Sequence, residues 1–126
     1  MKRVIGLGGP FLKANDPKAL AAWYEKHLGI GFGGGTYTVW PFADPEGKPN
    51  PGFNILSFFP QDTGYFAPAT KETMVNFIVE DLQGLFKNLK EEGVTIAGEP
   101  VNEEYGKFGW IIDPEGNKIE LWEPPK

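Results

Sequence analysis

Residues 74–93 read MVNFIVEDLQGLFKNLKEEG, an apolar run followed at once by a helical pattern. The apolar run ends at Glu80, and Asp81 is of a residue type that caps the N-termini of helices. Leucine and phenylalanine then recur on one helical face as far as Gly93, and glycine commonly ends helices. The residues on this face are Leu82, Leu85, Phe86 and Leu89. The stretch predicts a strand, then a helix that begins after Asp81 and stops at Gly93.

The first half of the chain carries the same pattern. Its apolar run, residues 3–13, ends just before Asp16, and Pro17 takes the first helical position, where its missing N–H costs nothing. Gly29 ends this helical pattern. The apolar face of the predicted helix carries Leu20, Trp23, Tyr24 and Leu28. The two capping Asp residues are 65 positions apart and the two terminating Gly residues 64 apart, so the sequence predicts an internal repeat.

Two later landmarks repeat in the same order. Residues 44–47 (Asp-Pro-Glu-Gly) recur as residues 113–116, and each motif is typical of a hairpin turn. Residues 55–60 align with residues 119–124 at an offset of 64. Four landmarks at nearly constant spacing favour a structural duplication over coincidence.

These landmarks divide the chain into two units. We expect a single α+β domain over residues 1–126, made of two βαβββ repeats at residues 1–62 and 70–126. A chain of this length is sufficient to bury one core. A sheet with a single helix leaves its other face uncovered, so two paired units enclose a space between them. The predicted architecture is therefore a curved mixed sheet around a cavity.

Composition restricts the functions open to this chain. The net charge is −5 and no basic run occurs, so we expect no nucleic acid and no membrane as partner, because both attract clustered Lys and Arg. The sequence has no Cys, which excludes disulfides and thiolate ligands. Neither a signal-peptide pattern nor an apolar run of membrane-spanning length is present, so the expected location is the cytoplasm.

The sequence resembles the vicinal oxygen chelate superfamily, which includes glyoxalase I, extradiol dioxygenases, and the bleomycin and fosfomycin resistance proteins. The resemblance rests on the predicted helix at residues 16–29 and on the closing run at residues 105–122, and it covers nearly the whole chain. It implies a small-molecule site between the two units. It also implies a homodimer, since domains of this superfamily commonly pair to complete their sites.

For the metal-dependent members, the resemblance implies a His or Gln on the first strand of each unit and a Glu near the end of its last strand. The corresponding residues here are Gly9 and Met74 on the first strands, and Leu56 and Glu120 on the last. Only Glu120 binds hard divalent cations, whereas a catalytic site usually takes about three protein ligands. His27, the single imidazole, falls in the last turn of the first predicted helix. We therefore expect no metal and no other cofactor.

Glu120 is the candidate for chemistry. Alternation along its predicted strand puts it on the same face as Trp122, and the resemblance places this face against the cavity. Desolvation there would raise the pKa of the carboxyl group and suit proton transfer. The alternatives are a ligand contact without catalysis, or a structural remnant bonded to a neighbouring polar group.

Other candidate residues lie on the same predicted faces. Asn76 follows Met74 by two positions, and a buried amide needs a partner, either on a ligand or on the backbone. Phe11 and Phe58 follow the corresponding first-half positions in the same way. These rings either wall a pocket or fill the space outright. The predicted ligand-binding set is Phe11, Phe58, Met74, Asn76, Tyr105, Trp110, Glu120 and Trp122.

Two tyrosines in Gly-containing loops are further candidates. Tyr65 and Tyr105 both stand beside glycine, and either hydroxyl is able to close over a ligand. For Tyr65 the simpler interpretation is an exposed turn residue. The same simple interpretation stays open for Tyr105.

Three functional hypotheses follow. The first is metal-independent binding of a small, partly aromatic or apolar molecule, for which the acidic chain favours a positive charge. The second is a lyase, isomerase or dioxygenase-type enzyme with Glu120 as general base or lone metal ligand. The third is a protein-interaction domain with a filled core.

Overall fold

The computed structural model describes residues 3–28, 30–43 and 49–126. Within these residues the chain forms two helices and eight strands. In chain order they are β1 (Val4–Ala14), α1 (Pro17–Leu28), β2 (Tyr37–Ala43), β3 (Pro49–Pro60), β4 (Thr73–Val79), α2 (Leu82–Glu91), β5 (Thr95–Ile96), β6 (Val101–Glu103), β7 (Gly106–Ile112) and β8 (Lys118–Glu123).

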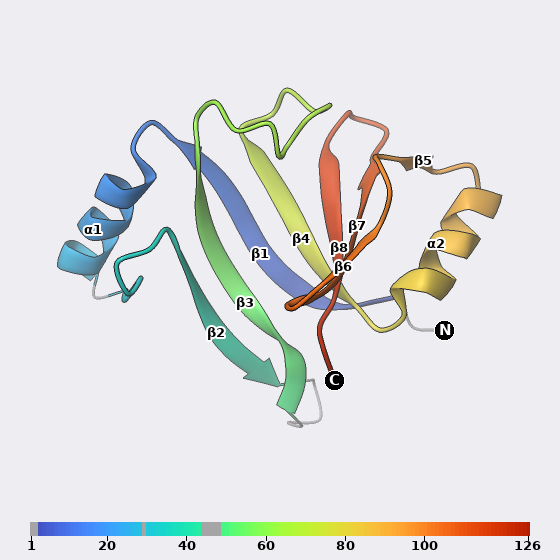
Figure 1. Cartoon of the computed structure of the whole chain (residues 1–126), viewed down its shortest axis with the longest axis horizontal. Coiled ribbons are helices and arrows are strands. Elements are labelled where there is room, and N and C mark those ends of the chain that lie inside the picture. The colour runs from blue at the N-terminus through green and yellow to red at the C-terminus, as the bar shows by residue number, and fades with distance from the viewer. Residues whose placement is uncertain (1–2, 29, 44–48) are drawn as a thin grey trace.

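One mixed sheet runs through both halves of the chain. Its strand order is β2-β3-β1-β4-β8-β7-β5, and β6 also pairs with β7. The first strands of the two predicted units, β1 and β4, pair antiparallel, while β1 with β3 and β4 with β8 pair parallel. Figure 1 shows the sheet bent, with α1 and α2 at its opposite ends. The predicted α+β fold with a curved mixed sheet is confirmed, whereas the division into two repeats stays a prediction.

Both helices begin where the sequence predicts. The Oδ1 atom of Asp16 accepts a hydrogen bond from the backbone N–H of Ala19 at 3.1 Å. Asp81 Oδ1 accepts the backbone N–H of Gly84 at the same distance. Each bond satisfies an N–H that the helix cannot pair internally. Neither helix, as far as it is described, is long and apolar enough to cross a membrane.

The predicted hairpin turn at residues 113–116 joins β7 to β8. Asp113 Oδ1 accepts the backbone N–H of Asn117 at 2.9 Å, and Gly116 has φ of +83°, which favours glycine. The matching turn predicted at residues 44–47 lies outside the described residues.

The strands that follow the helices differ between the two halves. After α2, β5 and β6 both pair with β7, so they form one strand interrupted near Gly98, which has φ of +89°. With β7 and β8 this gives the three strands predicted. After α1, the described residues contain β2 and β3 alone. The segment before β2 turns instead of extending, because Gly33 and Gly34 have φ of +58° and +81°.

The two helices pack on one face of the sheet, here called the helix face. Side chains of α1, β1, β3 and the segment between α1 and β2 form one cluster, with buried members Ala14, Ala21, Phe32 and Phe58. Side chains of α2, β4 and β8 form another, with buried members Val79, Leu82, Leu85, Phe86, Leu89 and Leu121. The apolar face predicted for α2 is therefore confirmed in full.

The opposite face, here called the inner face, carries a third cluster. Its buried members are Phe11, Phe66 and Met74, with Ile55, Phe59 and Trp110 packed against them. Phe66 belongs to no strand. It lies in the linker, defined here as residues 61–72 between β3 and β4, and its side chain is fully buried. The linker therefore folds back over the inner face of the sheet.

Candidate functional site

A buried carboxylate on the inner face organises the candidate site. Glu120 of β8 has an exposed fraction of 2%. Its Oε2 accepts a hydrogen bond from Asn76 Nδ2 at 2.5 Å, and its Oε1 accepts one from Trp110 Nε1 at 3.0 Å. The hydroxyl of Tyr65 donates a further hydrogen bond to Oε1. A carboxylate removed from water is costly unless it is hydrogen-bonded, and these donors supply that bonding.

Strand register explains two of the three donors. In the parallel pair of β4 and β8, Asn76 lies opposite Glu120. In the antiparallel pair of β7 and β8, Trp110 lies opposite the same residue. Gly8 leaves room for the amide, because a Cβ at that position would lie 1.7 Å from Asn76 Oδ1. The Oδ1 atom itself is buried without a hydrogen-bond partner among the described residues.

The third donor comes from the linker. The ring of Tyr65 stacks on Phe59 at 5.5 Å between centroids and meets Trp110 edge-on at 6.0 Å. Lys118 Nζ donates a hydrogen bond to the Tyr65 carbonyl oxygen at 2.5 Å and lies 5.2 Å from the centre of its ring. An aromatic side chain of the linker is therefore held over Glu120 by its ring, its hydroxyl and its backbone.

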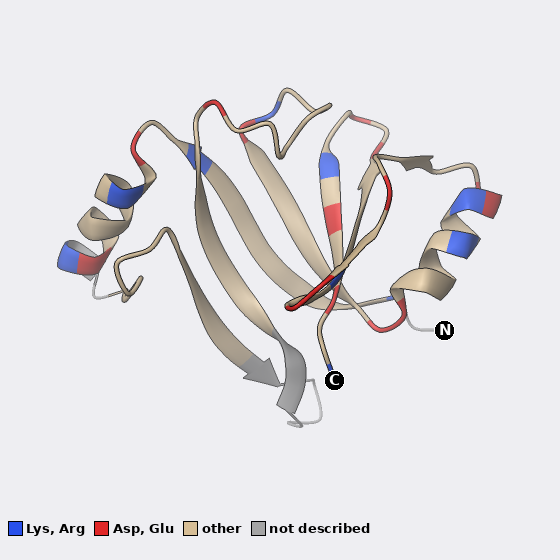
Figure 2. Cartoon of the chain, in the orientation of Figure 1, with Lys and Arg blue, Asp and Glu red and all other residues tan. Residues whose placement is uncertain are grey.

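The cations of the inner face cover the aromatic residues of the linker. Lys118 lies over Tyr65, and Lys13 of β1 places its Nζ 5.4 Å from the centre of the Phe66 ring. Figure 2 shows that charged residues gather on the helices and loops, whereas most of the length of the strands is uncharged. A charged residue on the inner face of a strand is thus uncommon here, which singles out Glu120 and these two lysines.

Burial governs the protonation of the site. It raises the pKa of Glu120 because the charged form loses its hydration, and the hydrogen bonds from Tyr65, Asn76 and Trp110 act against this rise. Burial also raises the pKa of the Tyr65 hydroxyl, and the charge of Glu120 raises it further. Burial lowers the pKa of Lys118, although Glu120 acts in the opposite direction. The hydroxyl therefore keeps its proton and donates a hydrogen bond to the carboxylate.

The structure brings together five of the predicted ligand-binding residues. Asn76 and Trp110 donate to Glu120, and Phe11 and Met74 lie in the apolar cluster that contains Trp110. Whether these residues contact a ligand stays a prediction.

Trp122 is buried, but its side chain contacts residues other than Glu120. Its indole N–H donates to the Tyr105 carbonyl oxygen at 2.7 Å, and its ring stacks on Phe108 with centroids 6.2 Å apart. The Tyr105 side chain is 63% exposed. Tyr65 is an exposed turn residue, as predicted, with an exposed fraction of 36%. Its hydroxyl is nevertheless the one that contacts Glu120, which the sequence did not predict.

Phe58 does not lie on the inner face, contrary to prediction. It packs on the helix face against Tyr24 and Phe32, with ring centroids 5.2 and 5.5 Å away. The cause is a shift of one residue in the alignment of the halves. Register pairs Ser57 with Phe11 in β3 and β1, so the inner face of β3 carries the odd-numbered residues.

The same shift of one residue changes which residue of this chain corresponds to one of the superfamily's metal-ligand positions. Ser57, not Leu56, takes the place in β3 that Glu120 takes in β8. At residue 9 a Cβ would lie 1.8 Å from the Ile55 carbonyl oxygen, and Gly9 has φ of +148°, so the backbone there accommodates glycine. No three His, Asp or Glu side chains converge among the described residues, and the His27 side chain lies outside them. The side chains at these positions do not fit the superfamily's kind of metal centre.

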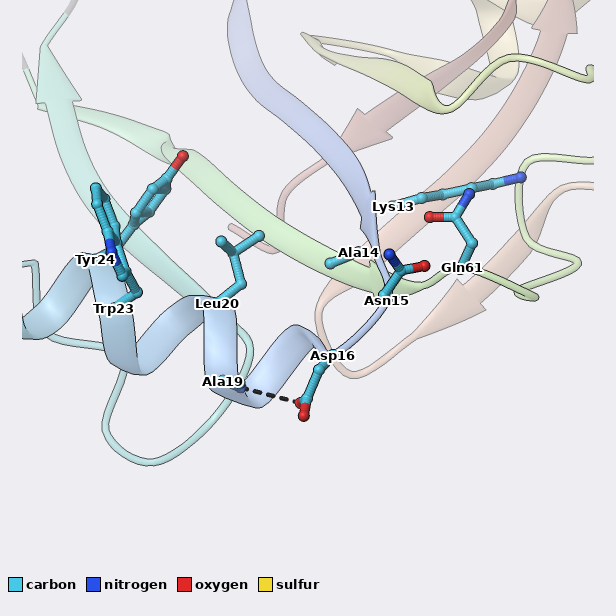
Figure 3. Close-up of a pocket in the computed structure, with 9 residues that line it drawn as sticks. All are labelled: Lys13, Ala14, Asn15, Asp16, Ala19, Leu20, Trp23, Tyr24 and Gln61. Atoms are coloured by element: carbon cyan, nitrogen blue, oxygen red, sulfur yellow. Dashed lines mark hydrogen bonds between the residues drawn. The ribbon is translucent and has the colours of Figure 1, made fainter.

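Two surface grooves lie away from Glu120. One, of about 640 Å³, runs beside α1 and is lined by residues that include Asp16, Trp23 and Gln61 (Figure 3). Figure 3 also shows Lys13 extending from the end of β1 past Gln61. The other groove, of about 580 Å³, lies between α2 and the β6 and β7 strands. Neither groove is lined by a residue of the predicted ligand-binding set.

Comparisons with known proteins agree with this architecture. A methylmalonyl-CoA epimerase variant from Streptomyces coelicolor, in complex with 2-nitronate-propionyl-CoA, has a TM-score of 0.69 at 16% identity and covers 98% of this chain and 99% of its own. The methylmalonyl-CoA epimerase from Mycobacterium tuberculosis has a TM-score of 0.63 at 21% identity, with 100% and 92% covered. The Mn(II)-bound glyoxalase from Novosphingobium aromaticivorans has a TM-score of 0.54 at 13% identity, with 98% of this chain but 40% of its own. At these identities the likeness establishes the fold alone.

The family comparison is more specific than the fold. A search of curated protein sequences gives no match. The family model of the Glyoxalase/Bleomycin resistance protein/Dioxygenase superfamily matches residues 10–121, which include both halves of the sheet and Glu120. The chain therefore belongs to the Glyoxalase/Bleomycin resistance protein/Dioxygenase superfamily.

Proposed function

We propose that this protein binds a small molecule on the inner face of its sheet, where a polar group of the ligand contacts Glu120. The observation that carries the proposal is a carboxylate with 2% exposure whose hydrogen-bond donors come from β4, β7 and the linker. Two donors belong to the rigid sheet. The third, Tyr65, is 36% exposed and belongs to a connecting segment, so it is the donor that a ligand is able to replace.

A purely structural role explains this arrangement less well. Burying a carboxylate in a sheet costs several kcal/mol, and an apolar residue of similar volume is often neutral or stabilising by comparison. Asn76 is fully buried and donates its amide N–H to Glu120, while its Oδ1 has no hydrogen-bond partner in the described part of the chain. A fold that keeps a charged group and a half-satisfied amide at its centre is typical of a binding site.

The test compares three single-ring probes that differ in their polar group: 4-methylphenol, benzylamine and benzoate. A carboxylate accepts hydrogen bonds, so we expect a probe with a donor group to bind and benzoate to be rejected. Binding is followed by protein NMR with the wild type and Glu120→Gln. Glu115→Gln, in the exposed turn of the same hairpin, is the matched control.

The expected result is binding that Glu120→Gln weakens and Glu115→Gln leaves unchanged. If Glu120→Gln fails to fold, Trp110→Phe, which removes one donor to the same carboxylate, takes its place. Equal binding by wild type and both variants would contradict a ligand contact at Glu120. So would rejection of all probes by the wild type and by Tyr65→Ala.

Proton transfer is the second candidate function. The observation that favours it is the raised pKa of Glu120, which burial causes and which brings a carboxyl group closer to the range useful in a general base. Glu120 would accept a proton from an acidic C–H group of the ligand. Deuterium incorporation from D₂O at the methyl carbon of acetophenone, whose C–H groups are activated by the carbonyl, is measured by NMR; it should occur with the wild type and vanish with Glu120→Gln. Binding without exchange would leave the first function alone.

We further propose that the site works without a metal, because Glu120 is the one carboxylate at the superfamily's ligand positions. Metal analysis of the purified protein should find no stoichiometric divalent cation, and a tightly held one would overturn this. The superfamily resemblance also leads us to propose a homodimer. Light scattering should give twice the chain mass of 13.9 kDa, and the mass of a single chain would exclude the dimer.

A further inference from the structure

We propose that the ligand is a neutral aromatic ring bearing a hydroxyl group, and that Tyr65 occupies its place in the present conformation. This inference rests on the proposed function, since it names the class of molecule that binds beside Glu120. The inner face already holds one aromatic hydroxyl in full contact with the site, and that group belongs to the protein itself.

The hydroxyl shares one carboxylate oxygen with a second donor. Tyr65 donates a hydrogen bond to Glu120 Oε1, and the indole N–H of Trp110 donates to the same atom at 3.0 Å. A hydroxyl has one proton to give and keeps lone pairs, so it tolerates a neighbouring N–H. An ammonium group has protons alone and places further donors beside the indole N–H. The polar end of the site therefore matches a hydroxyl better than an amine.

The surroundings of the ring form a slot for one aromatic system. Phe59 stacks on the Tyr65 ring at an interplanar angle of 14°, and Trp110 stands against it at 89°. Lys118 places its Nζ 5.2 Å from the ring centre and 5.3 Å from that of Trp110. Stacked, edge-on and cationic neighbours all favour a π-system over an aliphatic group.

Charge at the site also selects against a cation. Lys118 contacts the same ring that Glu120 contacts through the hydroxyl, so the two charges offset each other. A positively charged ligand would lie next to the ammonium group of Lys118, and like charges at short range repel. The earlier expectation of a cationic ligand, based on the net charge of the whole chain, is therefore replaced by a neutral one.

Tyr65 is placed so that it is able to leave. Around Tyr65 the backbone hydrogen bonds of the linker are local, from Ala67 N–H to the Gly64 carbonyl and from Ala69 N–H to the Phe66 carbonyl. The backbone bond from β1 to the linker, from Lys13 N–H to the Glu72 carbonyl, is at the far end of the linker. Moving the Tyr65 ring outward therefore leaves the sheet ladder intact. Because the internal ring competes with the ligand, the apparent affinity of the wild type is reduced by the fraction of molecules in which Tyr65 is displaced.

The experiment removes the internal ring and offers three external ones. Tyr65→Ala is titrated by NMR with 4-methylphenol, with 4-methylanisole, which cannot donate a hydrogen bond, and with benzylamine. We expect 4-methylphenol to bind Tyr65→Ala at least about tenfold more tightly than wild type. We also expect it to bind this variant at least about tenfold more tightly than either other probe, since a hydrogen bond to a charged group is worth that factor.

Tyr24→Ala is the matched control. It removes a tyrosine ring that packs on Phe58 at 5.2 Å on the helix face, away from Glu120. A void there should not distinguish 4-methylphenol from 4-methylanisole. If Tyr65→Ala behaves in the same way, the hydroxyl contact is overturned and the slot is an ordinary apolar void.

Failure of this inference is distinguishable from failure of the proposed function. Should Tyr65→Ala prefer benzylamine, and lose it on the added change Glu120→Gln, the binding site stands while the hydroxyl class is wrong. Should no probe bind the wild type or Tyr65→Ala, both fall. Tyr65→Ser offers the same tests if Tyr65→Ala is poorly folded.

Discussion

Phe66→Ala tests the packing of the linker on the inner face. The Phe66 side chain is fully buried, with the Phe59 ring 5.2 Å away and Lys13 Nζ 5.4 Å from its centre. Burying a whole Phe side chain contributes about 1.5–3 kcal/mol by transfer from water alone. The void left by truncation brings Phe→Ala substitutions to about 3–5 kcal/mol. A linker relaxes more easily than a helix or strand, so we expect a loss of about 3 kcal/mol.

The assay is urea unfolding of wild type and variant, with the midpoint and the slope fitted separately. Phe86→Ala, which truncates a buried ring on α2, is the control and should cost at least as much. Amide hydrogen exchange distinguishes Phe66→Ala from Phe86→Ala. Phe66→Ala should accelerate exchange at the amides of Ala67 and Ala69, so that their opening free energy falls below the free energy of global unfolding. A loss under about 1 kcal/mol, well below the range for a buried Phe, would refute the packing described for the linker.

Three further predictions concern other parts of the fold. Gly109→Ala should lower the free energy of unfolding by about 1–3 kcal/mol, because the new Cβ would lie 2.0 Å from the ring of Phe86; urea unfolding measures this, and a neutral result would contradict the packing of α2 on β7. Asp81→Ala should cost about 1 kcal/mol by freeing the backbone N–H of Gly84, and Asp81→Asn should restore most of it. Part of the free energy of unfolding of the wild type should be lost as the pH rises from 4.5, the ordinary pKa of a Glu carboxyl group, through the raised pKa of Glu120 in the folded protein. In this pH range the folded state binds the proton of Glu120 more tightly than the unfolded state does. Glu120→Gln should lack this component in unfolding measured from about pH 4 to about pH 8, and parallel pH profiles would contradict the burial of a titrating carboxyl.

Local sequence signals predict the helices and their ends well. Asp16 and Asp81 cap α1 and α2, and the four apolar residues predicted for one face of α2 are all buried. These features depend on residues within one or two helical turns, so they can be predicted from the local sequence. The second-half turn at residues 113–116 is predicted for the same reason, since its hydrogen bonds join residues four apart or closer.

The register of the strands is harder to predict from a single sequence. Side chains alternate along a strand with a period of two, so a shift of one residue exchanges the two faces. Such a shift put Phe58 on the inner face and made Leu56 the counterpart of Glu120, whereas the pairing of β1 with β3 gives that place to Ser57. The second half, where Glu120 lies opposite Asn76, has no such shift.

The contact between the linker and Glu120 could not be predicted from the local sequence. Tyr65 reaches Glu120 across 55 residues, and nothing next to it in the chain specifies that contact. One signal was present: two adjacent aromatic residues, Tyr65 and Phe66, stand in a connection otherwise made of polar and small residues and proline. Adjacent large rings in a loop indicate that the loop packs on a core, because exposing both would leave much apolar surface in water. The position of Lys118 could also be predicted, because it precedes Glu120 by two residues and therefore lies on the same face of β8.

The most direct test of a ligand site beside Glu120 is a crystal structure of Tyr65→Ala with 4-methylphenol. We expect the ring of the probe between Phe59 and Trp110, with its hydroxyl donating a hydrogen bond to Glu120. The two surface grooves beside α1 and α2 offer the alternative locations. A probe bound in either groove, with the space beside Glu120 filled by a collapsed linker, would contradict a ligand site at Glu120.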